Sequence, residues 1–273
     1  MRMPKSGHSA LVACLAFFGA VAVYGASAPQ RTVNRQTDAV RRGDEGPKET
    51  ENFDKTVPLP QNGTLKLRNF SGDVKISATN GRDVVIKATR RAGREQLDHI
   101  KLDVQTSGST VSIEANKRDA DWDKRENNVV DTTFEIQVPA SATLDVYGFS
   151  SNLDVRGVTG EQKVETFSGT ITVSGAKGAV HAEAFSGEID VDLSGAGDSP
   201  QLSAKTFSGG IRARLAQNAK GDVSFESFSG EFDSDLPIAL KSSNRKHMSG
   251  PLPGGSGKTL SFNTFSGSLR IVK

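Results

Sequence analysis

The 273-residue chain has one cysteine, one tryptophan and two tyrosines. The cysteine, Cys14, falls in an N-terminal segment that we expect to be removed on export. The remaining chain then has no thiol for a disulfide bond, for metal binding or for nucleophilic catalysis. Its stability must come from backbone hydrogen bonding and side-chain packing.

The chain also lacks an excess of charge of either sign. It has 34 lysine and arginine residues against 32 aspartate and glutamate residues. Residues 1–28 contain Arg2 and Lys5 but no acidic residue, so the charges of the remaining chain balance. A balanced charge does not favour a nucleic acid or an anionic membrane surface as a partner.

Long apolar runs are missing from the sequence except at the N-terminus. Ala10–Tyr24 is apolar, follows two basic residues and precedes Ala26-Ser27-Ala28. This run is about 15 residues long, whereas a membrane span needs about 20. The pattern predicts a secretory signal peptide over residues 1–28, and therefore export to the periplasm or cell surface of a Gram-negative bacterium, with no membrane span after cleavage. Pro29 is an unfavourable neighbour for a cleavage site, so a retained anchor is the alternative.

Residues 29–52 contain many charges, no aromatic residue and only two valines as larger aliphatic side chains. Such a composition cannot bury enough apolar surface to offset the entropy of ordering the chain. It predicts a disordered linker over residues 29–52.

The tripeptide Phe-Ser-Gly recurs along the rest of the chain. It starts at Phe70, Phe167, Phe185, Phe207, Phe228 and Phe265, with variants at Phe149 and Met248. From Phe149 onward, successive motifs are 17 to 22 residues apart. A catalytic motif is needed once, whereas a motif repeated at a near-constant spacing is typical of stacked structural units.

Apolar and polar residues alternate on both sides of each motif, as at Val180 and Ala182 before Phe185, and at Ile189 and Val191 after it. A period of two predicts β-strands. The apolar positions lie at odd distances before the aromatic residue and at even distances after it, so the chain must turn a corner between two strands. Glycine permits such a backbone. The predicted corner glycines are Gly72, Gly169, Gly187, Gly209, Gly230, Gly250 and Gly267.

One unit of about 20 residues cannot bury its apolar face alone, so the units must stack. Stacking in register predicts an all-β fold, a parallel β-solenoid whose equivalent side chains lie about 4.8 Å apart. The seven phenylalanines and Met248 are then expected to form a ladder. Because a row of exposed aromatic side chains favours aggregation, we place this ladder in the core or packed along its edge.

Outward positions alternate in charge between consecutive units, as stacking in sequence order would favour. The predicted charge rows are Glu183, Lys205 and Glu226; Asp190, Arg212 and Asp233; and Asp192, Arg214 and Asp235. In this interpretation each basic residue lies between two acidic ones. An exposed pair contributes only about 0.2–1 kcal/mol, so the rows are expected to set register more than stability.

Residues 53–140 are less regular than residues 141–273. They contain several strand-like segments, one candidate helical turn at residues 94–98, and a polar loop around Trp122. We interpret residues 53–140 as irregular first coils or as a small β-sheet cap, because an open solenoid end invites further strand pairing. Residues 53–273 are then one continuous domain.

The unit around Met248 departs from the pattern. Polar residues replace its inward apolar residues, and two prolines follow, neither of which can donate to a strand ladder. We expect residues 241–258 to bulge outward as a mobile loop where a partner can dock. Leu260–Ile271 is expected to rejoin the stack as the closing coil.

Two short patterns are compatible with ligand binding but favour ordinary loops. The stretch Gly254–Thr259, "GGSGKT", lacks the first glycine, the strand and the helix of a phosphate-binding loop. Asp119, Asp121 and Asp123 have the opening spacing of a calcium loop, but the required glycine and glutamate are missing further along. Only an opportunistic calcium site remains open there.

No catalytic residue, metal site or cofactor is predicted. His99, His181 and His247 fall in separate units without metal-ligand spacing. The corner serines have no recurring histidine or aspartate beside them, as a serine hydrolase would need.

A carbohydrate-active enzyme is nevertheless an alternative, because parallel β-helices include polysaccharide lyases and hydrolases. The charge rows would then form its sugar-cleaving face, although their regular alternation favours a structural role. Carboxylates about 5–10 Å apart in one groove and unpaired with arginine would favour the enzyme.

The repeats, the lead-in "FDKTVPLPQNGTLKLRNFSGDVKISATNGRDVVIKATRR" and the bridge "FEIQVPASATLDVYGFSSNLDV" resemble the bacterial β-strand-repeat family known as "putative adhesins", over Phe53–Lys273. The resemblance implies a solenoid and assigns no catalytic residues. We therefore expect an exported, non-enzymatic binding or scaffolding module of the cell envelope, with an unidentified protein or glycan ligand. Besides the enzyme, an accessory protein of envelope-stress signalling is an alternative. The sequence does not specify an oligomeric state.

Overall fold

The computed structural model describes residues 48–273, except residues 121, 123–128, 245 and 256. The predicted signal peptide lies outside the described residues, as do Asp121 and Asp123 of the calcium-like pattern. The predicted linker overlaps the described part at its end, where Glu49–Asn52 pair with a strand at residues 89–92. The prediction of disorder as far as residue 52 is therefore wrong for these residues, because backbone pairing orders them despite their polar composition.

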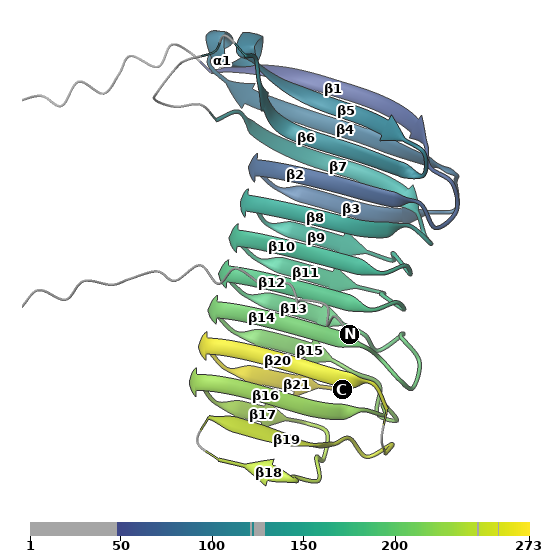
Figure 1. Cartoon of the computed structure of the whole chain (residues 1–273), viewed down its shortest axis with the longest axis vertical. Coiled ribbons are helices and arrows are strands. Elements are labelled where there is room, and N and C mark those ends of the chain that lie inside the picture. The colour runs from purple at the N-terminus through teal and green to yellow at the C-terminus, as the bar shows by residue number, and fades with distance from the viewer. Residues whose placement is uncertain (1–47, 121, 123–128, 245, 256) are drawn as a thin grey trace, which may run out of the picture. The chain divides into compact units, whose positions relative to one another are not determined.

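The described part of the chain is all-β, with two large and mostly parallel sheets (Figure 1). Sheet A has the spatial order β1 (Glu49–Pro58), β4 (Asp83–Ala92), β7 (Asp131–Pro139), β3 (Val74–Thr79), β9 (Leu153–Arg156), β11 (Ile171–Ser174), β13 (Ile189–Asp192), β15 (Ile211–Arg214), β21 (Leu269–Val272) and β17 (Phe232–Ser234). Sheet B has the order β18 (Ser242–Ser243), β19 (His247–Pro251), β16 (Asp222–Ser229), β20 (Thr259–Ser266), β14 (Leu202–Ser208), β12 (Val180–Ser186), β10 (Gln162–Ser168), β8 (Thr143–Ser150), β2 (Thr64–Ser71), β6 (Thr110–Arg118) and β5 (Ile100–Ser107).

Each repeat contributes one strand to each sheet, and we call such a pair a coil. The seven coils are β2–β3, β8–β9, β10–β11, β12–β13, β14–β15, β20–β21 and β16–β17. Neighbouring coils pair in parallel and in register, so Val164 of β10 lies beside Val146 of β8 and Ala182 of β12. Equivalent positions of the repeat therefore form continuous rows along the stack, visible as the ladder of strand pairs in Figure 1.

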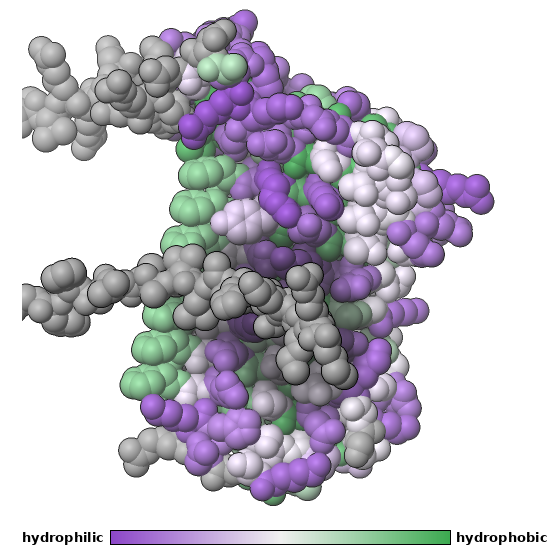
Figure 2. All heavy atoms as spheres, in the orientation of Figure 1, coloured by the Kyte–Doolittle hydropathy of each residue, from purple (hydrophilic) through white to green (hydrophobic). Residues whose placement is uncertain are grey.

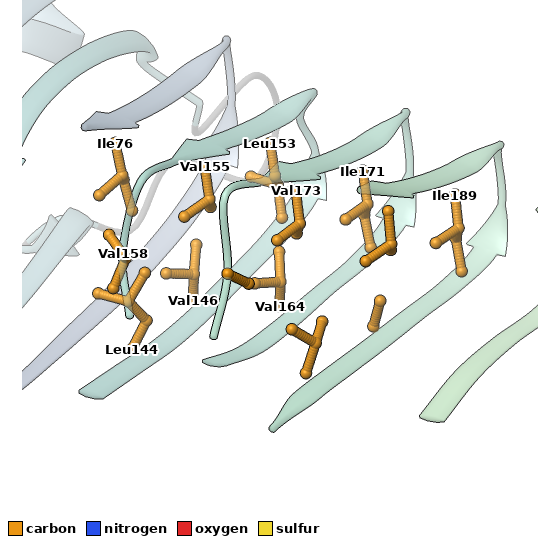
Figure 3. Packing of buried hydrophobic residues seen from close by; sticks show 14 of the residues in the cluster. Ile76, Leu144, Val146, Leu153, Val155, Val158, Val164, Ile171, Val173 and Ile189 are labelled. Atoms are coloured by element: carbon orange, nitrogen blue, oxygen red, sulfur yellow. The ribbon is translucent and has the colours of Figure 1, made fainter. Parts of the chain in front are cut away.

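The core lies between the two sheets and is built by the alternating apolar residues. Val146 and Val164 point inward from sheet B, while Val155 and Val173 point inward from sheet A (Figure 3). All four side chains are buried. The change of parity at each corner is thus what keeps both strands of a coil facing the same core.

The corner glycines are needed for close stacking of one corner on the next. Gly187 has a φ of 155°, and a Cβ atom there would lie 1.9 Å from the carbonyl oxygen of Gly169 in the next coil. The same holds at Gly267, where a Cβ would lie 1.8 Å from the oxygen of Gly209. No other residue type fits without moving the backbone, which explains why glycine recurs at this position.

The N-terminal end of the stack is formed by antiparallel pairs rather than by regular coils. β1, β4 and β7 pair antiparallel in sheet A, and β5 and β6 pair antiparallel in sheet B. The predicted helical turn is present as α1 (Arg94–His99), between β4 and β5. The coil β2–β3, which also falls in residues 53–140, belongs to the regular stack, because β2 pairs in parallel with β8.

The last coil in the sequence is not the last coil in space. β20–β21 lies between β14–β15 and β16–β17, and is seen in Figure 1 as a yellow layer between two green ones. The prediction that Leu260–Ile271 closes the stack is therefore wrong. The chain passes over one coil position between β15 and β16, and the C-terminal coil fills it.

The unit around Met248 forms neither a coil nor an outward loop. β19 runs antiparallel to β16 and pairs with the short β18, so the expectation of a bulging loop is wrong for this segment. Met248 is buried opposite Phe225 and does not join the phenylalanines. Antiparallel pairing places its apolar side chain toward the core although its neighbours in sequence are polar.

Candidate functional site

Seven phenylalanine side chains form one continuous stack on the outside of sheet B. We call this stack the phenylalanine ridge; in spatial order it consists of Phe70, Phe149, Phe167, Phe185, Phe207, Phe265 and Phe228. Neighbouring ring centroids are 4.7–4.9 Å apart, and most neighbouring planes differ by 6° or less. Figure 2 shows apolar side chains in a column along the carboxyl ends of the sheet B strands.

The ridge lies outside the core. The expectation that the phenylalanine ladder lies in the core is therefore wrong. Its residues are between 37% and 56% exposed. Each phenylalanine has the same parity as the outward residue two positions earlier, such as Glu165 before Phe167. Stacking covers the ring faces, so mainly the ring edges meet solvent, and this limits the exposed apolar area without burying the ridge.

A cation covers one end of the ridge. The ammonium group of Lys246 lies 4.5 Å from the ring centroid of Phe228, within the range of a cation–π interaction. Phe228 is the ring where the stack of coils ends, so its outer face has no further phenylalanine to meet. Lys246 belongs to the segment that sequence reasoning assigned to a free loop.

Small residues fill the corner directly beneath the ridge. They are Asn69, Gly148, Thr166, Ala184, Thr206, Thr264 and Ser227, each immediately before a ridge phenylalanine and each buried. Thr166 donates a hydrogen bond of 3.0 Å from its hydroxyl to the carbonyl oxygen of Ser151, and Thr206 donates one of 3.2 Å to that of Gly187. These bonds connect adjacent coils at the corner and hold the strand ends that carry the rings.

A second row of outward residues runs beside the ridge. Each of its members precedes a ridge phenylalanine by two positions on the same strand. We call it the polar row; in spatial order it consists of Arg68, Tyr147, Glu165, Glu183, Lys205, Asn263 and Glu226. Lys205 therefore lies beside Glu183 as predicted, but its other neighbour is Asn263. The predicted contact between Lys205 and Glu226 is wrong because the C-terminal coil separates them.

An open groove runs between the ridge and the polar row. One stretch has a volume of 470 Å³ and extends from Tyr147 to Phe265. A further stretch of 380 Å³ shares Asn263 and Phe265 with the first and reaches His247. The groove thus offers an apolar wall of ring edges opposite a wall of carboxylate, amide and ammonium groups.

The outer face of sheet A carries the other two predicted charge rows, and the C-terminal coil interrupts both. Arg212 lies beside Asp190, but its other neighbour is Arg270, which itself lies beside Asp233. The prediction that Arg212 lies between two aspartates is therefore wrong, since two arginines are adjacent instead. Arg270 binds Asp233 at 3.5 Å.

The third row is interrupted in the same way. Arg214 lies beside Asp192 and binds it at 3.4 Å, but its other neighbour is Val272 rather than Asp235. Partial burial opposes ionisation of Asp192, but hydrogen bonds from Ser194 and the charge of Arg214 outweigh it, so the pKa of Asp192 is lowered. Asp192 and Asp233 are thus each paired with an arginine, which is the arrangement expected of a charge row.

One group of side chains has atoms close enough to share a cation. Ligand atoms of Glu165, His181 and Glu183 all lie within 4.8 Å of one another. The fold brings Glu165 beside this histidine from the next coil, which the sequence spacing could not show. Lys163 already binds Glu165 at 3.1 Å, and the group is partly exposed, so these residues form an ion-pair cluster without a built metal site.

The remaining sequence patterns lie at separate places in the fold. His99, the last residue of α1, stacks on Trp122, and His247 lies 3.6 Å from Glu226 at the far end of the groove. Thr259, the last residue of the "GGSGKT" stretch, begins β20, so a strand stands where a phosphate-binding loop has its helix. Through the described ranges of the chain, no helix is long and apolar enough to cross a membrane.

Comparison with known protein families identifies the family of this chain. A family model described as Toastrack DUF4097 matches residues 47–271. The chain belongs to this family. The match confirms the resemblance drawn from the Phe-Ser-Gly repeats, because Toastrack proteins are the family of unknown function to which those repeats pointed.

Several solved structures are similar to this Toastrack chain. A "putative cell adhesion protein" from Clostridium sporogenes is 12% identical with a TM-score of 0.43, covering 81% of this chain and 99% of the other. A "putative adhesin" from Bacteroides fragilis is 10% identical with a TM-score of 0.33, covering 81% and 97%. One from Parabacteroides merdae is 10% identical with a TM-score of 0.23, covering 84% and 97%. None of the curated proteins matches the chain significantly.

Proposed function

We propose that this protein is an exported, non-enzymatic β-solenoid that binds a partner through the phenylalanine ridge and the adjoining groove. Its work is then adhesion or scaffolding in the cell envelope of a Gram-negative bacterium. The parallel, in-register coils support the solenoid description. The basic start, short apolar run and small residues of the N-terminus support export.

The observation that carries the proposal is the exposed ridge itself. Monomeric soluble proteins rarely expose large contiguous apolar patches, and such patches commonly mark interaction sites. Seven half-exposed phenylalanines in one line exceed what scattered surface residues would give. The groove beside them adds polar groups that can fix the orientation of a partner.

Binding screens with matched variants test this proposal. The full chain would be applied to glycan and protein arrays, together with a ridge variant, Phe167→Ser with Phe207→Ser. The control would be Thr172→Ala with Arg212→Ala, which changes the sheet A strands of the same two coils. Ligands bound by the unmodified chain should bind the ridge variant at least about tenfold more weakly and the control equally well.

Two results would contradict the proposal. If the ridge variant retains binding while the control loses it, the binding face is sheet A. If a bound polysaccharide is cleaved during the incubation, the chain is a carbohydrate-active enzyme instead. Far-ultraviolet circular dichroism of both variants checks that the β fold is retained.

A further inference from the structure

The ridge and the polar row together have the size of a protein–protein interface. A phenylalanine side chain offers about 200 Å², so seven rings at the observed exposures present about 600 Å². A stable interface buries about 800 Å² on each partner. The ridge supplies most of this area, and the adjoining polar row supplies the rest.

The ring orientation narrows the kind of partner. Neighbouring rings cover each other's faces at 4.7–4.9 Å, so a ligand that needs an aromatic face, such as a stacked sugar ring, has no free face along the ridge. What remains is a straight line of apolar ring edges. A second line of apolar side chains at the same spacing can bury these edges along the whole ridge.

We infer that the ridge binds the ridge of a second copy of this chain, face to face and with the coil order reversed. This rests on the proposed function, because it uses the same surface as the binding face. The two-fold axis runs parallel to the sheet B strands and passes over β12. An isologous contact of this type is the commonest way in which identical chains associate.

The length of the ridge fixes the position of the axis. The middle ring of the seven is Phe185, on β12. Only an axis over this ring places all seven phenylalanines of one copy against all seven of the other. A shift of half a coil or more leaves rings without a partner and buries less apolar surface.

The polar row provides an independent check of this register. Reversed about Glu183, it brings Arg68 opposite Glu226, Tyr147 opposite Asn263, and Glu165 opposite Lys205, in two symmetric contacts each. Both pairings between charged residues join opposite signs. Apart from the residue on the axis, no like charges of the polar row meet.

The residue on the axis is Glu183, which faces its own copy. Within the chain it lies between Glu165 and Lys205 on the neighbouring strands, and its carboxylate is 3.6 Å from His181. The side chain of Lys205 makes no ion pair or hydrogen bond with another described residue, so its ammonium group is available to Glu165 of the second copy. The outward residues two positions before the polar row add no repulsion away from the axis. In this arrangement Lys163 of one copy faces Ser203 of the other.

Charge exchange tests the inference on the full chain by sedimentation equilibrium. We expect the unmodified chain to be a dimer, and Glu165→Lys or Lys205→Glu alone to weaken it about tenfold or more, since each creates two like-charge contacts. An equimolar mixture of the two variants should dimerise again, because both contacts between unlike copies then join opposite charges. Arg212→Glu, on sheet A of the Lys205 coil, is the control and should leave the dimer unchanged.

Three outcomes would overturn the inference. The first is an unmodified chain that stays monomeric at concentrations of about 100 µM. The second is a dimer that neither single variant weakens. The third is a mixture that fails to re-form dimers, or rescue of Lys205→Glu by Glu183→Lys instead, which indicates a register shifted by half a coil.

The test also separates this inference from the proposed function. If the unmodified chain is monomeric but Phe167→Ser with Phe207→Ser abolishes binding to an array ligand, the ridge is a binding face for another partner and the self-association is wrong. If the chain forms the predicted dimer and the array finds no ligand, the partner is the second copy alone.

Discussion

The two strands that meet at each corner place different residues on the outside of the molecule. On the sheet B side the outward residue is phenylalanine in all seven coils. On the sheet A side the corresponding outward residues, three positions later, are Asp73, Asn152, Thr170, Glu188, Gly210, Ser268 and Glu231. The inner faces of both sheets are mostly apolar, so this difference on the outside has no role in forming the core.

This comparison separates what stacking requires from what it leaves free. Stacking requires apolar inner residues and corner glycines, and both sheets contribute to it equally. The sheet A face shows that a polar outer row is compatible with the same coils. The phenylalanine ridge of sheet B is therefore an addition to the fold, which is why we assign function to that face.

The largest expected change in the free energy of unfolding comes from comparing an inward-pointing and an outward-pointing phenylalanine on one strand of sheet B. Phe262 is 1% exposed and Phe265, three residues later on β20, is 46% exposed. Phe262→Ala should lower the free energy of unfolding by about 3–5 kcal/mol, because it empties a buried site. Phe265→Ala should cost about 1–2 kcal/mol, since it loses two ring contacts at the surface. Urea unfolding measures both, and equal losses would mean that the ridge is part of the core.

The corner between the two faces should be nearly as sensitive. Gly187→Ala should lower the free energy of unfolding by about 3 kcal/mol, because the new Cβ meets the carbonyl oxygen of Gly169 and the φ of 155° strains the residue. Gly195→Ala is the control: no atom lies within 4 Å of its added Cβ, and the change should be below about 0.5 kcal/mol. If Gly187→Ala were as harmless as the control, close stacking of corners would not explain the repeated glycine.

On the sheet A face the effects should be smaller and dependent on pH. The pKa of Asp192 is lowered from its ordinary value of 3.8, so ionised Asp192 stabilises the fold above about pH 4, and this contribution is lost as the pH falls through the lowered pKa. Asp192→Asn should therefore cost less than about 1 kcal/mol at pH 7 and progressively less toward pH 2. The control is Asp190→Asn on the same strand, because the carboxylate of Asp190 makes no ion pair or hydrogen bond with another described residue. A cost that grows on acidification would contradict this assignment.

The smallest effect is expected at Arg212. Its neighbours are Asp190 on one side and Arg270 on the other, so Arg212→Glu exchanges one like-charge contact for another. The change in the free energy of unfolding should be within about 0.5 kcal/mol. A cost near 1 kcal/mol would instead fit stacking in sequence order, with an aspartate on each side. Thermal unfolding at low ionic strength resolves the two.

The regular part of the fold could be predicted because a few physical rules determine it. A period of two identifies the strands, and the change of parity at Phe-Ser-Gly locates the corner. The inward positions before and after Phe185, such as Ala182 and Val191, are buried as the alternation requires. Parallel pairing in register follows because only stacked units can bury these rows.

The order of the coils could not be predicted in the same way. Every coil has the same apolar pattern, so each can pair with almost any other, and the sequence order was assumed. The alternation of Asp190, Arg212 and Asp233 favoured that order, but exposed ion pairs contribute too little to determine it. The irregular segment before β20 gives the chain enough length to return between β14–β15 and β16–β17.

The outward position of the ridge could be predicted from the alternation of the strand residues, although a different expectation prevailed. Phe167 has the parity of Glu165, so alternation alone places it outside. The risk of aggregation suggested a core or edge position instead. The structure shows how the ridge limits that risk, since stacked rings cover each other's faces and Lys246 covers one end.

Chemical cross-linking tests most directly whether sheet B, and not sheet A, is the binding face. With Cys14 replaced by serine the chain has no cysteine, so single cysteines can be placed on either face. Glu183→Cys lies on the proposed two-fold axis, and Asp190→Cys lies on the sheet A strand of the same coil. A short bismaleimide reagent should link Glu183→Cys into a covalent dimer and leave Asp190→Cys monomeric. Equal linking of the two variants, or linking of Asp190→Cys alone, would contradict the account.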